Sequence, residues 1–285
     1  MASVVYRSEV LVDVECGETL SPPCITGDGR RAVVVANPYG IMHVLDIRTR
    51  RMREAVRVEG IDRSVYSISP VSGARVALEL CMNIAIVDTD NGRIERRIAT
   101  VPSPIRALCA AGGERVASLH YDGIIRVWET ATGGKVGEGD ERVTAMCLME
   151  EKGALAFVDE KGTLHLPDGR EVQDACRPAM HHRLCCAGDV VCCSTDGICC
   201  AVDVRAKRVI SSFRGWRVAP LGKGRVLVEC RERTHGASVV DVATGEVVAE
   251  VREEVIDAAG GGDGGEAAVV TTEDGRLLLV LPCAA

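Results

Sequence analysis

Hydrophobic residues in this chain come in short valine-rich runs, and glycine and acidic residues separate one run from the next. The clearest stretch is RVASLHYDGIIRVWETATGGKV, which spans Arg115 to Val136. It contains an apolar run, a tight turn at Gly123, a second apolar run that ends in an acid, and another turn. Nowhere does the chain show the sustained 3.6-residue period of a long helix. The pattern therefore predicts an all-β protein made of hairpins.

This hairpin pattern returns along the whole sequence. Measured at the first turn of each copy, it recurs about every 40 residues, and seven copies nearly exhaust the 285 residues. The turn positions are Gly40, Asn83, Gly123, Gly162, Gly197, Gly236 and Gly275. A period near 40 with paired strands in each copy is the sequence signature of a β-propeller blade. We predict a single domain over residues 1–285, a seven-bladed β-propeller of four-stranded antiparallel blades.

The two ends of the chain predict how the last blade is completed. The seventh copy runs out after its third strand, whereas an apolar segment from Val4 to Val14 precedes the first copy. An unpaired strand at the edge of a sheet is prone to aggregation. We therefore predict that Val4–Val14 is the outer strand of the seventh blade, beside Arg276–Leu281, and closes the ring.

The copies resemble WD repeats, with some features of the related YVTN-type propeller repeats. The tryptophan–acid ending of the third strand stands at Trp128–Glu129. Other copies end the same strand in an apolar residue and an acid, at Leu45–Asp46, Val87–Asp88, Val202–Asp203 and Val240–Asp241. The Gly-His pair that opens a standard WD repeat is missing, although the resemblance covers nearly the whole chain. The resemblance implies a non-enzymatic scaffold for protein–protein interactions within a multiprotein complex, with partners on the propeller faces.

Composition narrows the range of partners. A net charge of −7 does not favour general nucleic-acid binding. The N-terminus lacks the apolar core of a signal peptide, and no run approaches the roughly 20 apolar residues of a membrane span. We expect a cytoplasmic protein that binds other proteins, without membrane attachment and with nucleic acid contacted only indirectly. The alternatives are a lyase-type or hydrolase-type propeller enzyme or small-molecule binder with a site at the central channel, and a subunit of an RNA-associated complex.

No group of residues has the spacing of a catalytic site, and phosphate-loop, dinucleotide and nucleophile-elbow motifs are missing from the sequence. We therefore expect no enzymatic activity, no cofactor and no bound metal. The stretch RTRRMRE suits an acidic partner or a phosphate, although charges on an outer strand also deter aggregation. An exposed tryptophan is a candidate hot spot, whereas a buried one only packs. The candidate partner-binding residues are Arg48, Arg50, Arg51, Arg53, Trp216 and Arg217.

Six of the fourteen cysteines form three pairs within RLCCAGDVVCCSTDGICCAVDV. Alternation along paired strands predicts two rows, with Cys186, Cys192 and Cys200 on one face and Cys185, Cys193 and Cys199 on the other. Corresponding positions in other copies hold valine, alanine and leucine, which favours core packing of the thiols. Disulfides and a metal site are the alternatives. The neighbouring His181–His182 is a structural pair or a ligand pair, and no third ligand is evident nearby.

Overall fold

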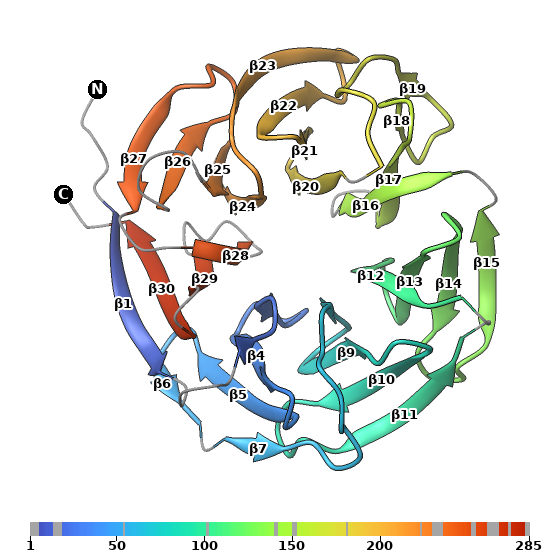
Figure 1. Ribbon diagram of the computed structural model, residues 1–285, viewed down its shortest axis with the longest axis vertical. Helices are drawn as coiled ribbons and strands as arrows, with labels where there is room; N and C mark the ends of the chain where they lie inside the picture. Colours follow the sequence, from blue (N-terminus) through green and yellow to red (C-terminus); the bar gives the residue numbers. More distant parts are fainter. Residues whose placement is uncertain are drawn as a thin grey trace. The chain divides into compact units, whose positions relative to one another are not determined.

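The computed structural model describes residues 6–13, 19–53, 55–100, 103–139, 142–149, 153–180, 182–222, 224–229, 236–251, 255–260, 268–272 and 275–282. Seven antiparallel sheets, mostly of four strands, are arranged as the blades of a β-propeller (Figure 1). The described residues form strands and turns, with no helix long and apolar enough to cross a membrane. The chain divides into two compact units, an N-terminal unit (residues 10–142 and 274–277) and a C-terminal unit (residues 143–273, 1–9 and 278–285).

Three blades lie in the N-terminal unit, and two of them pair their strands in chain order. The second blade consists of β8 (Ile68–Pro70), β9 (Arg75–Glu79), β10 (Asn83–Asp88) and β11 (Ile94–Ala99). The third consists of β12 (Ile105–Ala110), β13 (Arg115–His120), β14 (Ile125–Glu129) and β15 (Lys135–Gly139).

The first blade departs from four continuous strands. Its second and third strands are β4 (Arg31–Asn37) and β5 (Ile41–Asp46). Its inner and outer strands are each divided in two, giving β2 (Thr19–Leu20), β3 (Cys24–Ile25), β6 (Arg51–Met52) and β7 (Val56–Arg57). Pro22 and Pro23 separate β2 from β3, because proline has no N–H to donate to the neighbouring strand.

The C-terminal unit holds three further blades whose strands also pair in chain order. The first is β16 (Val143–Met149), β17 (Ala154–Asp159), β18 (Leu164–His165) and β19 (Glu171–Val172). The second is β20 (Arg183–Ala187), β21 (Val190–Thr195), β22 (Ile198–Asp203) and β23 (Arg208–Arg214). The third is β24 (Val218–Gly222), β25 (Arg225–Glu229), β26 (Ala237–Asp241) and β27 (Val247–Val251).

The remaining sheet joins the two ends of the chain. It has the strand order β1-β30-β29-β28, with β1 at Tyr6–Asp13, β30 at Arg276–Pro282, β29 at Ala268–Thr272 and β28 at Val255–Gly260. The N-terminal strand is therefore the outer strand beside the C-terminal one, which confirms the predicted closure. The predicted segment also includes residues 4, 5 and 14, which lie outside the described residues.

The turns between second and third strands follow the predicted chemistry. Glycine takes a positive φ in five of them, at Gly40, Gly123, Gly162, Gly197 and Gly275. The second copy has no glycine there, and Cys81 adopts a φ of 66° in its place. Glycine enters this left-handed region without steric cost, which is why it marks most copies so clearly in the sequence.

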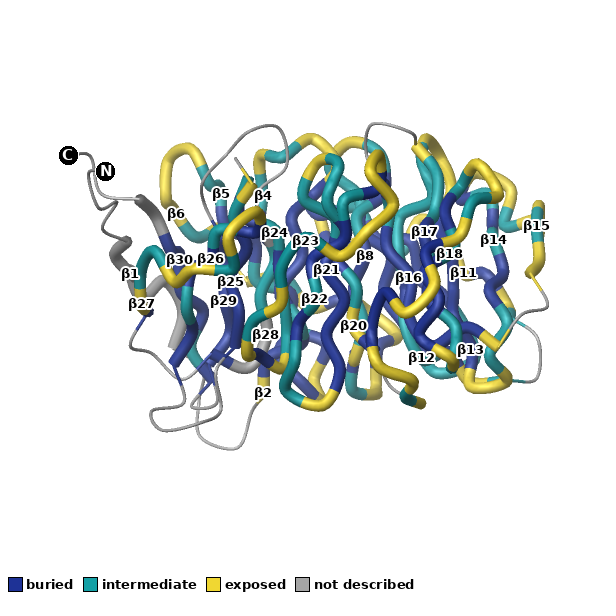
Figure 2. The backbone as a smooth tube through the Cα atoms, turned by 90° about the horizontal axis from the view of Figure 1, so that it is seen from above, coloured by how far each residue is buried: buried dark blue, intermediate teal, exposed yellow. Residues whose placement is uncertain are grey.

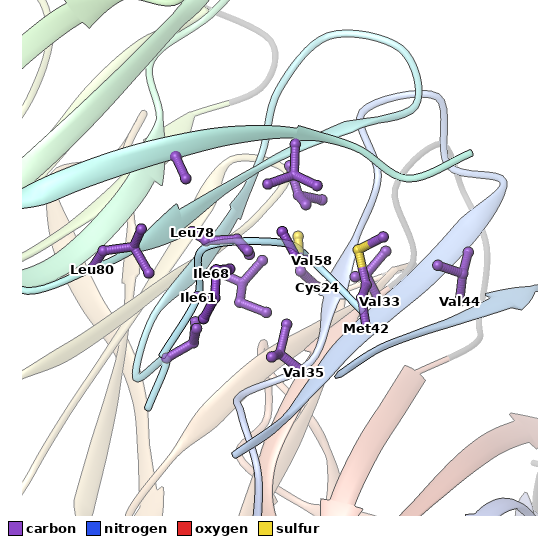
Figure 3. Close-up of a cluster of buried hydrophobic side chains, with 14 residues drawn as sticks. Cys24, Val33, Val35, Met42, Val44, Val58, Ile61, Ile68, Leu78 and Leu80 are labelled. Carbon is purple, nitrogen blue, oxygen red and sulfur yellow. The ribbon is translucent and has the colours of Figure 1, made fainter. Parts of the chain in front are cut away.

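Small aliphatic side chains fill the space between neighbouring blades. In the N-terminal unit, Val33 and Val35 of β4 pack into one cluster with Leu78 of β9 (Figure 3). Val58 and Ile61, from the segment that joins the first two blades, belong to the same cluster. Figure 2 shows the second and third strands of the blades as largely buried, with exposed residues in the turns and on outer strands such as β15. The core therefore lies between sheets and is built mainly of aliphatic side chains, in a sequence with only 3% aromatic residues.

The cysteine-rich blade, β20–β23, differs by one residue from the predicted register. Cys185 pairs with Cys192, and Cys193 pairs with Cys200. The prediction was wrong because both turns are two-residue loops, whereas the predicted pairs need loops of odd length. Gly197 and the preceding Asp196 both have positive φ, of 77° and 49°, as a two-residue hairpin turn requires. A shift of one residue moves every side chain of a strand to the opposite face.

The true register separates the thiols into two environments. Cys185, Cys192 and Cys199 are buried in a cluster with Val226 and Val228 of the next blade, which confirms core packing for these three. Because side chains alternate along a strand, the adjacent Cys186, Cys193 and Cys200 lie on the other face, where Cys193 pairs with Cys200. All eleven cysteines in the described part of the chain are free thiols.

Candidate functional site

Each blade has one edge where a joining loop enters it. In the second and third blades the first strand begins beside the end of the second strand, as in the pairs Ile68–Leu78 and Ile105–His120. The entering loop and the turn between the second and third strands therefore share one edge, which we call the entry edge. In the N-terminal unit Asn37, at the end of β4, is hydrogen-bonded to Val65 before β8, and the Ile105 N–H at the start of β12 donates to the Cys81 carbonyl after β9 (2.8 Å), so the entry edges of its three blades lie together.

Three exposed tyrosines occupy these entry edges. Tyr39 lies in the turn between β4 and β5, Tyr66 in the loop before β8, and Tyr121 in the turn between β13 and β14. They are 54%, 73% and 69% exposed. The other large hydrophobic side chain exposed in the described part of this unit is Val136, on the outer strand β15. We call the set Tyr39, Tyr66 and Tyr121 the tyrosine face.

Buried polar side chains hold the backbone next to one of these rings, that of Tyr66. The side chain of Asn37 accepts a hydrogen bond from the Val65 N–H (2.8 Å) and donates one to the Val65 carbonyl (3.2 Å). The carboxylate of Glu79 accepts from the N–H groups of Tyr66 (3.3 Å) and Cys81. Burial raises the pKa of Glu79, while the two N–H donors act in the opposite direction. The loop that carries Tyr66 is thus tied to the ends of β4 and β9.

A hollow of about 220 Å³ opens beside this loop. It is lined by Gly60, Asp62, Arg63, Leu80, Met82, Asn83 and Arg97. Arg97 donates to the carbonyl of Gly60 (2.9 Å), which joins β11 to the entering loop. The tyrosine face therefore adjoins a shallow site that two guanidinium groups line.

The predicted arginines lie away from the tyrosine face. Arg48, Arg50 and Arg51 are exposed on the turn after β5 and on β6, at the opposite end of β5 from Tyr39. Arg53 forms an ion pair of 2.5 Å with Asp90 of the second blade. This hydrogen bond lowers the pKa of the Asp90 carboxyl. Arg53 therefore joins two blades, and the other three arginines line an exposed turn and strand.

Trp216 and Arg217 belong to the C-terminal unit. Trp216 lies in the loop before β24 and is exposed, at 40%, which of the two predicted alternatives is the one that makes it a hot-spot candidate. Its ring covers Gly197, where an added Cβ would lie 3.3 Å from the indole. Arg217 pairs with the buried Glu229 at 3.4 Å. These two residues contact neighbours within their own unit, at Gly197 and Glu229.

The C-terminal unit also contains a cluster that sequence reasoning missed. Ligand-type atoms of Cys176, His182 and Cys193 all lie within 4.8 Å of one another, and all three residues are buried. We call these residues the thiol–histidine cluster. The hydrogen bond with Cys193 lowers the pKa of the Cys176 thiol to about 6, and the His182 ring acts in the same direction. His181, the other half of the predicted histidine pair, lies outside the described residues.

No protein-family model matches this chain, and no curated protein is similar enough to it to count as a relative. The case for a function therefore depends on the tyrosine face and the thiol–histidine cluster themselves.

Proposed function

We propose that this propeller is a non-enzymatic scaffold that binds a partner protein through the tyrosine face of its N-terminal unit. One observation carries the proposal: Tyr39, Tyr66 and Tyr121 are each more than half exposed on the entry edges of three successive blades. Tyrosine is enriched among the residues that dominate protein–protein binding energy, because its ring is large and rigid and its hydroxyl stays polar. Single exposed apolar residues are ordinary, whereas a group on one edge favours a docking surface.

The rigidity of the surface supports this function. The hydrogen bonds with Asn37 and Glu79 fix the backbone at Val65 and at the N–H of Tyr66. A surface that is already ordered loses less conformational entropy when a partner docks. Loops on a rigid scaffold are also where binding residues concentrate in proteins generally.

The shape of the neighbouring hollow favours a protein over a small molecule. Its volume of about 220 Å³ is below the roughly 300–1,000 Å³ typical of small-molecule pockets. A hollow of this size suits one side chain of a partner. Arg63 and Arg97 line it together with Asp62, and the remaining excess of positive charge would favour an acidic side chain, since guanidinium groups form paired hydrogen bonds with carboxylates.

We also propose that the blades are degenerate WD-type repeats. In the third blade the indole N–H of Trp128 donates to the hydroxyl of Ser118 (2.8 Å), which lies 2.8 Å from Nε2 of His120. The tryptophan of the tryptophan–acid ending is therefore anchored in a buried polar network that includes a histidine. This network supports the resemblance in the copy where the sequence signal is strongest.

The test is a capture experiment with a matched control. The full-length chain serves as bait in extract of the cells that express it, beside a Tyr39→Ser/Tyr66→Ser/Tyr121→Ser variant. The control replaces three exposed apolar residues of outer strands, as Val136→Ser/Val209→Ser/Val247→Ser. We expect a stoichiometric protein partner with the wild type and the valine variant, and its loss with the tyrosine variant. A partner that the tyrosine variant retains and the valine variant loses would place docking on the outer strands and contradict the proposal.

A further inference from the structure

The thiol–histidine cluster is built where a joining loop meets the next blade. Cys176 and His182 belong to the loop between β19 and β20, and Cys193 belongs to β21. Cys176 is fixed by its N–H, which donates to the carbonyl of Gly162 (3.2 Å). A Cβ at Gly162 would lie 2.1 Å from the Cys176 carbonyl oxygen, so only glycine admits this close approach. The two thiols and the ring are therefore brought together by the path of the chain.

The donor set suits zinc. Thiolate and imidazole are the ligands that zinc prefers, at about 2.3 Å for sulfur and about 2.0–2.1 Å for nitrogen. Two sulfurs on one tetrahedral zinc stand about 3.8 Å apart at that bond length. Because the three ligand atoms already lie within 4.8 Å of one another, a bound ion would require only small side-chain movements.

The hydrogen bonds of His182 present one ring nitrogen toward a metal. Nε2 lies 2.8 Å from the carbonyl oxygen of Arg177, which can only accept, so Nε2 carries the hydrogen. Nδ1 then holds the lone pair, and it lies 2.6 Å from the hydroxyl of Thr144. That hydroxyl has a second acceptor in the Val158 carbonyl at 3.0 Å, so a metal ion can take its place at Nδ1. A backbone carbonyl that holds the remote N–H is the usual support of a metal-bound histidine.

We infer that Cys176, His182 and Cys193 form a zinc-binding site, independent of the proposed docking function. The ion fastens the joining loop to β21. It does so beside a blade whose outer strands, β18 and β19, have two residues each and offer little support of their own. The fourth position falls to a water molecule or to Cys200, the cross-strand partner of Cys193.

The site is tested by titrating Zn²⁺ into the full-length protein, stripped with a chelator and kept reduced, against a chromophoric competitor. Cys176→Ala and Cys193→Ala remove proposed ligands. Cys186→Ala is the matched control, because it removes a half-buried thiol from the same blade. We expect one tightly bound zinc per chain in the wild type and the control, and affinity weaker by more than about 100-fold in the two ligand variants.

Measurements on the wild type keep the inference testable if a variant does not fold. Cobalt in place of zinc should give the intense visible bands of a tetrahedral ion and a thiolate charge-transfer band, and zinc should raise Tm above that of the chelated protein. Absence of zinc binding in the wild type, or equal affinity in all folded variants, would overturn the inference. So would a Cys176–Cys193 disulfide mapped by mass spectrometry in purified protein that takes up no zinc.

Discussion

Two buried histidines, one in each unit, hold a blade-joining loop in place through a bond from the ring to a loop carbonyl, and they differ in the side chains that lie beside the ring. His120 ends β13, and its Nδ1 donates to the loop carbonyl of Ser103 (2.7 Å). Its Nε2 accordingly accepts from the hydroxyl of Ser118 (2.8 Å), which accepts in turn from Trp128. Each donor in this series of hydrogen bonds has an acceptor, so both nitrogens of the neutral His120 ring are bonded to oxygen atoms.

His182 plays the same part with sulfur beside it. Its Nε2 is fixed by a loop carbonyl, as Nδ1 of His120 is, but its neighbours include the thiols of Cys176 and Cys193. Thiols are weak hydrogen-bond partners and, once deprotonated, strong metal ligands. The comparison teaches that one structural task, anchoring a joining loop, is met by a closed oxygen network in one unit and by a metal-competent cluster in the other.

The largest expected loss of stability comes from removing the Trp128 indole, whose N–H donates to Ser118 beside His120. Trp128 is 4% exposed and packs in a cluster with Ile84, Ile86 and Leu108. Trp128→Ala should lower the free energy of unfolding by about 3–5 kcal/mol, because it leaves a cavity and removes the N–H that donates to the Ser118 hydroxyl. Trp216→Ala, at the half-exposed tryptophan, should cost less than about 1 kcal/mol. Guanidinium unfolding of both variants measures the difference, and equal losses would show that Trp128 is not the anchor of its blade.

A second comparison removes one hydroxyl beside each histidine. Ser118→Ala deprives both Trp128 and His120 of a buried partner and should cost about 2–3 kcal/mol. Thr144→Val keeps its shape and should cost about 1–2 kcal/mol in chelated protein. Zinc should offset most of the Thr144→Val loss, since the ion takes the place of the hydroxyl at His182, and should leave the Ser118→Ala loss unchanged. Urea unfolding with zinc and with chelator measures both, and equal zinc responses would remove the contrast between the two histidines.

The fold could be predicted because its signals are local. Glycine and aspartate recur at the hairpin turns once in most blades, so the number of blades could be predicted from positions such as Gly123 and Gly197 without tertiary information. The register of the cysteine blade could not be predicted in the same way. The two-residue loop at Gly188–Asp189 places Cys192 opposite Cys185, whereas a three-residue loop would place it opposite Cys186. The turn sequence is compatible with either length.

The candidate sites were harder to predict than the fold for a tertiary reason. Cys176 lies 17 residues before Cys193 in the sequence, and only the path of the loop past Gly162 brings the two thiols together. The tyrosine face did leave a signal, because Tyr39 and Tyr121 stand in the same turn of two copies. The arginines of an outer strand give an ambiguous signal, because charge there also protects the edge of a sheet.

The smallest expected effect concerns protonation of the oxygen network. Burial lowers the pKa of His120 below the ordinary 6.5, while its bond to Ser103 acts in the opposite direction. The unfolded chain therefore binds a proton below pH 6.5 that the folded chain resists, so the contribution of His120 to stability is present above that pH and falls as the pH drops. One such group can account for at most about 1.4 kcal/mol at pH 5.5. Unfolding in urea at pH 7.5 and 5.5 should show that His120→Gln loses less stability on acidification than the wild type. A His43→Gln variant, at a half-buried histidine of β5, controls for the removal of any imidazole. If the wild type and His120→Gln lose the same stability between pH 7.5 and 5.5, the His120 ring takes up its proton without disturbing the network.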